Sequence, residues 1–241
     1  SNNTAVGYAS LTANTTGYGN VAVGALALDA NTDATNNTAL GYAALSTNTT
    51  GVNNTAIGSA SLHASSTASS NTAVGYASLY ANTTGANNTA VGLSTLFYST
   101  TGASNVAMGY RALYVNTTGS SNVALGASAL AANTTASNNT AVGQSALISN
   151  TTGTNNVAVG ALALDANTTA NGNIAVGASS LGSNTTGASN IGIGHEALGF
   201  NVTSNQNTAI GYAALWKNTA ADNTAIGFGA LQFNTTGNQN T

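Results

Sequence analysis

The chain alternates between short apolar blocks and polar, turn-forming blocks at a fixed interval. An Asn that begins an Asn-x-Ala/Gly-x-Gly pattern recurs every 17 residues from Asn3 to Asn207 and then after 16 residues at Asn223. A further Asn follows after 17 residues at Asn240. The unit reads N-[TVI]-A-[VILM]-G-x-x-[AS]-L-x-x-N-T-T-G-x-x, and we number its positions one to seventeen from the Asn. Self-similarity at a fixed period is the signature of solenoid architectures.

The apolar half of the unit predicts a short strand rather than a helix. It spans about nine residues with a central Gly, and Asn-Thr-Thr-Gly, which favours turns and disfavours helix, follows it. Segments such as Thr4-Ala5-Val6-Gly7 are short, β-branched and bounded by turn residues, as strands are. We therefore predict an all-β parallel β-solenoid (β-roll) of about fourteen 17-residue coils, stacked ~4.8 Å apart. We expect one uninterrupted array over residues 1–241.

The single short unit predicts which half of the coil is a loop. Asn207 to Leu215 and Asn223 to Leu231 keep the usual eight-residue step, so the missing residue falls within 217–222. Loops tolerate deletions better than packed strands do. We expect positions one to nine to face the core and positions twelve to seventeen to form a turn or outer wall.

Each position of a solenoid unit becomes a row of equivalent side chains. Position nine is always Leu, and a fully buried Leu contributes roughly 1.5–3 kcal/mol, so this row is the best core candidate. The predicted core row is Leu11, Leu28, Leu45, Leu62, Leu79, Leu96, Leu113, Leu130, Leu147, Leu164, Leu181, Leu198, Leu215 and Leu231. Position four is predicted as a second core row: Val6, Val23, Ile57, Val74, Val91 and their equivalents.

Three further rows carry conformational information. Position three is Ala except at Gly192, which predicts crowding by the opposite wall of a thin coil or by a second chain. Position five is always Gly, which predicts a positive φ or a close backbone approach at a corner. The Asn rows at positions one and twelve are expected to hydrogen-bond along the stack or to adopt left-handed turn conformations.

Position twelve also creates sequence motifs for N-glycosylation. The candidate acceptors are Asn14, Asn48, Asn82, Asn116, Asn150 and Asn184, and Asn133, Asn167 and Asn234 head the same Asn-Thr-Thr triplet. Modification requires an exported chain and a cell with the machinery. The alternative, which we favour, is a hydrogen-bonded Asn-Thr row that resembles an acceptor by composition.

Charge is almost missing, which limits the classes of function. Only 3% of residues are charged, against ~25% in ordinary domains, and the net charge is −3. Two basic residues cannot neutralise a phosphate backbone, so no nucleic-acid partner is expected. The absence of Cys excludes disulfides and thiolate metal sites. No stretch approaches the ~18 apolar residues of a membrane span, so no membrane insertion of this segment is expected.

The titratable residues predict neither an enzyme nor a cofactor or metal site. His195 and Glu196 are an adjacent pair, but neighbours along a strand point to opposite faces. His63 stands alone, and Arg111 and Glu196 share position seven five coils apart, too far to pair. Catalysis needs such groups to converge, and here they are dispersed.

Two variable surfaces suggest binding alternatives. Position six is often aromatic, which suits either a platform for sugars or, as we favour, side chains that stack on a solvent-facing row or between chains. The position-six residues include Tyr8, Tyr42, Tyr76, Tyr110, His195, Tyr212 and Phe228. Threonine rows at positions thirteen and fourteen suit an ice-binding solenoid, although only one of two adjacent rows is expected to face outward.

The repeat core resembles that of a known family. Asn3-Thr4-Ala5-Val6-Gly7, Asn20-Val21-Ala22-Val23-Gly24 and Asn207-Thr208-Ala209-Ile210-Gly211 resemble the head repeats of trimeric autotransporter adhesins (YadA-like). The longer unit is similar to repeats of phage-type tail fibres. The adhesin resemblance implies a left-handed β-roll, three chains side by side, an extracellular location and attachment. The unit here is longer than the usual adhesin head unit, and its extra residues fall in the turn half.

The expected function is structural. Residues 1–3 and 240–241 cut the array within a unit and without a distinct cap, which predicts a piece of a longer fibre or a stackable filament subunit. We expect an extracellular or cell-surface fibre or stalk segment whose partner is itself, as a homotrimer or longer filament. The alternatives are an adhesin or glycan-binding module, with surface glycans as partners, and an ice-binding solenoid.

Overall fold

Each repeat unit begins with a three-residue strand at positions two to four. The structure is a computed structural model, and it describes residues 2–241. Within these residues the strands are β1 Thr4–Val6, β2 Val21–Val23, β3 Thr38–Leu40, β4 Thr55–Ile57, β5 Thr72–Val74, β6 Thr89–Val91, β7 Val106–Met108, β8 Val123–Leu125, β9 Thr140–Val142, β10 Val157–Val159, β11 Ile174–Val176, β12 Ile191–Ile193, β13 Thr208–Ile210 and β14 Thr224–Ile226. The rest of each coil consists of turns and bends, and no described residue is helical.

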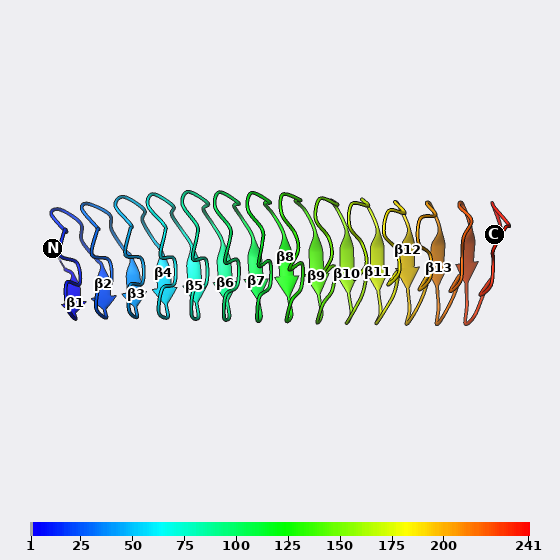
Figure 1. Ribbon diagram of the computed structural model, residues 1–241, viewed down its shortest axis with the longest axis horizontal. Coiled ribbons are helices and arrows are strands. Elements are labelled where there is room, and N and C mark those ends of the chain that lie inside the picture. The colour runs from blue at the N-terminus through cyan, green and yellow to red at the C-terminus, as the bar shows by residue number, and fades with distance from the viewer. Residues whose placement is uncertain (1) are drawn as a thin grey trace. The chain divides into compact units, whose positions relative to one another are not determined.

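The chain divides into two compact units, the first ending at Ser121 and the second running from Asn122 to Thr241. In the first unit β1 to β7 pair in chain order, and in the second β8 to β14 do so, always parallel. Figure 1 shows the strands of each unit side by side, joined by narrow loops. The register matches equivalent residues, as in Ala73 opposite Ala90. The prediction of a parallel β-solenoid with 17-residue coils is confirmed.

Backbone hydrogen bonds join neighbouring coils on several sides. The amide of Thr72 donates to the Asn88 carbonyl of the next coil at 2.8 Å, and the amide of Gly75 donates to the Ile57 carbonyl of the preceding coil at 2.7 Å. On the opposite wall the amide of Leu79 donates to the Thr95 carbonyl at 2.9 Å. Because equivalent bonds recur from coil to coil within each compact unit, stacking satisfies the backbone polar groups there.

The corners of the coil use left-handed backbone conformations. Gly24 at position five has φ +134°, and a Cβ there would clash with the Gly41 carbonyl oxygen. Both reasons predicted for this Gly row are therefore confirmed. Non-glycine residues with φ near +50° to +60° fill positions seven, nine and seventeen, as at Leu26, Leu28 and Asn36. The Asn rows at positions one and twelve are not among them. Left-handed conformations cost L-residues roughly 1–2 kcal/mol each, which stacking and burial must offset.

The core is thin and half polar. In the inner coils the buried positions are one, three, eight, nine, twelve and fifteen, which carry Asn, Ala, a small residue, Leu, Asn, and Gly or Ala. Positions twelve and fifteen therefore line the core, and the prediction that the Asn-Thr-Thr-Gly half forms only a turn or outer wall is wrong. The chain is too short per coil to enclose more than one large side chain, so polar Asn groups fill the remainder.

The prediction of position four as a second core row is wrong. Side chains alternate along a strand, so the inward Ala at position three sends positions two and four outward. Ala22 is fully buried, whereas Val6 is 58% exposed and Leu40 is 45% exposed. The equivalents Val23, Ile57, Val74 and Val91 are only half-buried.

The Ala row is crowded by the opposite wall of its own solenoid. Gly192 is the exception in this row, and a Cβ there would lie 2.6 Å from Ser180 Oγ, 3.1 Å from the Ala197 carbonyl oxygen and 3.4 Å from Leu181 Cγ. Ser180 Oγ donates to the Gly192 carbonyl at 2.9 Å. The Ser180 hydroxyl thus takes the space of the missing methyl group, and of the two predicted causes of crowding the thin coil is the one observed.

The short unit keeps its strand register. Thr208, Ala209 and Ile210 of β13 pair with Thr224, Ala225 and Ile226 of β14. The missing residue falls in the turn, where Asn218 donates to the carbonyl of Ala220, two residues on instead of three. The predicted location of this deletion is confirmed.

Candidate functional site

The predicted leucine row lies inside the coils. Twelve of its members, from Leu28 to Leu215, are fully buried. Leu11 in the first coil is 9% exposed and Leu231 in the last is 40% exposed. The row therefore forms an apolar column, and neither a ligand nor a partner reaches its inner members.

The two Asn rows close each coil from within. In the third coil Asn37 Nδ2 and Asn48 Nδ2 both donate to the Gly51 carbonyl, at 2.8 and 3.0 Å. Asn37 Oδ1 also accepts a hydrogen bond from the backbone amide of Asn54 in the next coil, at 2.9 Å. Each Asn thus satisfies backbone groups of its own coil and of a neighbour, and the predicted hydrogen bonding along the stack is confirmed.

The candidate glycosylation sites coincide with the second of these rows. Asn48, Asn82, Asn116, Asn150 and Asn184 are fully buried, and Asn14 is half-buried. Their Nδ2 atoms donate to the carbonyl three residues on, at 2.9–3.1 Å. A glycan would replace one of the two hydrogens of such a nitrogen, and at the fully buried members it has no space in the folded coil. The structure favours the hydrogen-bonded row over the acceptor interpretation.

Of the two threonine rows, one is used internally. The position-thirteen hydroxyl donates to the carbonyl of the equivalent residue in the next coil, as Thr83 Oγ1 does to Thr100 at 3.0 Å. Thr84 and Thr101 at position fourteen are exposed. The expectation that only one of the two rows faces outward is confirmed, while ice binding itself stays a prediction.

The outer strand face, formed by positions two and four, presents apolar side chains in register. The exposed residues at position four are Val6, Leu40, Met108, Ile193, Ile210 and Ile226, and those at position two are Val21, Val106 and Ile174. The other position-two residues are mostly Thr, whose methyl group extends the same surface. Each of the two compact units therefore presents a regular apolar face on which the exposed side chains recur with the spacing of the strands.

Aromatic rings at positions ten and six stack from coil to coil. At position ten His63, Tyr80 and Phe97 form consecutive stacks with ring centroids 5.0 Å apart. At position six His195, Tyr212 and Phe228 stack at 5.4 and 5.1 Å. The favoured prediction for position six, stacking along a solvent-facing row, is confirmed for these three rings. The position-ten stack was not predicted, although four consecutive units with His63, Tyr80, Phe97 and Tyr114 at one position signal it.

The charged residues remain apart in the described part of the chain. Arg111 lies over the rings of Tyr110 and Tyr114, 5.3 and 4.8 Å from their centroids. His195 stacks on Tyr212, while Glu196 is half-buried. Among residues 2–241 no three His, Cys, Asp or Glu side chains gather as metal ligands would. The same residues contain no helix long and apolar enough to cross a membrane.

Neither a protein-family model nor a curated protein matches the chain.

Proposed function

We propose that this chain is a structural segment of an extracellular fibre or stalk, and that copies of it associate through the outer strand face. A second copy of the chain is the partner, in a homotrimer or a longer filament. The role is mechanical: to hold a surface or an attached element at a distance.

The outer strand face is the observation that carries this proposal. Its apolar side chains are spaced by the strand repeat, so a surface with the same period can match it coil for coil. Another copy of this chain has the same 17-residue repeat and therefore the same strand spacing. Burial of exposed residues such as Ile193 and Ile210 would contribute ~25 cal/mol for each Å² removed from water.

The uncharged surface also supports assembly into a fibre. A charge repeated at one position would place like charges ~4.8 Å apart along the stack, and the chain avoids this with Asn and Thr. The resemblance of segments such as Asn207–Gly211 to adhesin head repeats supports the cell-surface location and the side-by-side packing.

Two lysines placed on the outer strand face test the proposal. The double substitution Val142→Lys and Val176→Lys puts a charge on β9 and on β11, with one unchanged strand between them. We expect the assembled mass, measured by sedimentation velocity, to fall to that of a monomer because two ammonium groups would have to be desolvated. The circular dichroism spectrum should not change.

The matched control carries the same charges in the same coils. Thr152→Lys and Thr186→Lys lie at position fourteen, which is exposed and away from the outer strand face. This variant should assemble like the wild type. A wild type that sediments as a monomer, or a Val142/Val176 variant that assembles unchanged, would overturn self-association through this face.

A further inference from the structure

Each of the two compact units contains a groove along the row of position-ten side chains. Groove 1, in the first unit, has a volume of about 630 Å³ and runs past Asp29, Ser46, His63 and Tyr80. Groove 2, in the second unit, has a volume of about 260 Å³ and runs past Asp165, Gly199 and Trp216. Small-molecule sites commonly measure ~300–1,000 Å³, so the two grooves fall within or just below that range.

The two grooves begin at coils of identical sequence. The segments 21–32 and 157–168 both read VAVGALALDANT, and only these two coils carry Asp at position ten. In both grooves small residues follow at position ten, Ser46 in one and Gly182 and Gly199 in the other, before an aromatic residue appears. The same order of acidic, small and aromatic side chains is therefore built twice.

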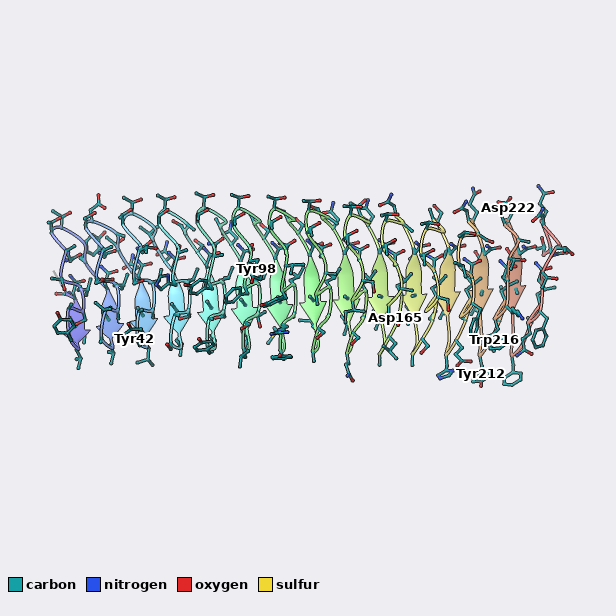
Figure 2. The ribbon with its side chains drawn as sticks, viewed as in Figure 1. Tyr42, Tyr98, Asp165, Tyr212, Trp216 and Asp222 are labelled. Carbon is teal, nitrogen blue, oxygen red and sulfur yellow. The ribbon has the colours of Figure 1, made fainter. Side chains whose placement is uncertain are left out.

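In groove 2 the acidic and aromatic side chains lean toward each other over the glycines. A Cβ on Gly182 would lie 3.3 Å from Asp165 Oδ1, and a Cβ on Gly199 would lie 3.3 Å from Trp216 Nε1. Gly182 and Gly199 belong to neighbouring coils, ~4.8 Å apart. Figure 2 shows Asp165 and Trp216 on the same half of the coils, with Asp222 at the opposite edge. The carboxylate and the indole N–H thus border one small space.

Polar atoms in both grooves lack hydrogen-bond partners. Trp216 Nε1 in groove 2 and Asp29 Oδ1 in groove 1 are buried and unpaired. A buried unpaired donor or acceptor costs about 1–3 kcal/mol, so a ligand that hydrogen-bonds to these atoms would offset that cost. Burial raises the pKa of the Asp165 carboxyl, which reflects the same incomplete solvation.

Aromatic rings form an apolar wall in each groove. In groove 1 the rings of His63 and Tyr80 stack at 5.0 Å, and the exposed Tyr42 and Tyr76 flank Ser59, where the position-six row lacks a ring. In groove 2 Phe200 meets Trp216 edge-on at 4.7 Å between centroids. A ligand ring can lie against such walls.

We propose that grooves 1 and 2 are binding sites for neutral carbohydrate, each taking a pyranose ring of a glycan. A sugar hydroxyl donates to the aspartate, a second sugar oxygen accepts the Trp216 N–H in groove 2, and the C–H face of the ring packs on the aromatic wall. A sugar supplies donors, acceptors and an apolar face in one ring, which matches the three kinds of group present. This inference does not rest on self-association of the chain.

The single tryptophan makes groove 2 directly observable. Trp216 is the one Trp of the chain, so its fluorescence reports on this groove alone. We would titrate the protein with cellotetraose, maltotetraose, mannotetraose, galactotetraose and tetra-N-acetylchitotetraose, and with calcium chloride alone. A saturable fluorescence change with at least one sugar is expected. No saturable change with any sugar, or a change with calcium only, would overturn the proposal.

Two pairs of variants locate the bound sugar. Asp165→Asn keeps the shape of groove 2 but weakens the hydroxyl contact, so the affinity should fall about tenfold or more. Asp222→Asn removes the same charge at the exposed opposite edge and should not change the affinity. Equal affinity of the Asp165 variant and the wild type would contradict the assignment.

Filling the groove gives a second, independent comparison. Gly182→Tyr places a ring where Tyr80 and Tyr114 stand in other coils, so we expect the protein to fold and sugar binding to be lost. Ala131→Tyr makes the corresponding change at position ten outside both grooves and should bind normally. Circular dichroism and thermal melting of both variants verify that they are folded. Binding retained by a folded Gly182→Tyr variant would overturn the site.

Discussion

At the scale of single residues, the asparagines do as much as the leucines to define the coil. One buried Leu per coil supplies roughly 1.5–3 kcal/mol, but the interior also contains two buried amides whose donors converge on one carbonyl. A missing Asn should therefore leave a defect. Position twelve is Ser at Ser65 and Ser99, and the Oδ1 atoms of Asn48 and Asn82 in the preceding coils are buried without partners, as are both serine hydroxyls.

Restoring the row should stabilise the protein. In Ser65→Asn the new amide can donate to Asn48 Oδ1, as Asn31 does to Asn14 at 2.8 Å. We expect the free energy of unfolding, measured by chemical denaturation, to rise by about 1–3 kcal/mol because a buried acceptor gains its partner. The control Ser70→Asn, at the exposed position seventeen where other coils have Asn, should change stability little. A Ser65→Asn protein with a lower free energy of unfolding than the wild type would contradict the claim that the missing hydrogen bond to Asn48 Oδ1 costs stability.

At the scale of the strand and turn, the sequence predicts the coil but not which side of the strand faces inward. The repeat length, the strand and the location of the deletion in the turn follow from repeat positions at which the residue type never varies, such as those of Gly24 and Leu28. The position-four row was assigned to the core on hydrophobicity alone. Thr at position two in most units was the available signal, since positions two and four share a face. The left-handed φ of Leu28 could not be predicted, because stacking overrides the preference of that residue.

Strand and turn should therefore differ sharply in their response to deletion. Removal of Thr101 at the exposed position fourteen reproduces the short unit at Asn207–Asp222 and should lower the melting temperature by only a few degrees, ~1–2 kcal/mol. Removal of Val91 shifts the coil by one residue and places Leu93 at the corner where Gly92 has φ +135°. That protein should lose its cooperative melting transition, followed by circular dichroism. Equal effects of the two deletions would contradict the assignment of strand and turn.

At the scale of the whole molecule, the two proposed surfaces differ in origin, because one follows the repeat and the other departs from it. The outer strand face follows from the repeat itself, although its position-four row was predicted to lie in the core. Grooves 1 and 2 arise where position ten changes from Asp29 or Asp165 to small residues, and these changes are not periodic. Their signal was the duplicated segment at 21–32 and 157–168. The depth of the grooves depends on how side chains lean along the stack, which composition and spacing do not specify.

Distances between equivalent residues test the central claim, that each 17-residue unit is one coil of a stack. The chain has no native Cys, so spin labels can be attached to introduced cysteines at exposed position-fourteen sites of the second unit. The pair Thr135→Cys and Thr203→Cys spans four coils, and the pair Thr135→Cys and Thr236→Cys spans six. Electron double resonance should give ~19 Å and ~29 Å, a step of ~4.8 Å per coil. Distances that do not grow in proportion to the number of coils would contradict the solenoid.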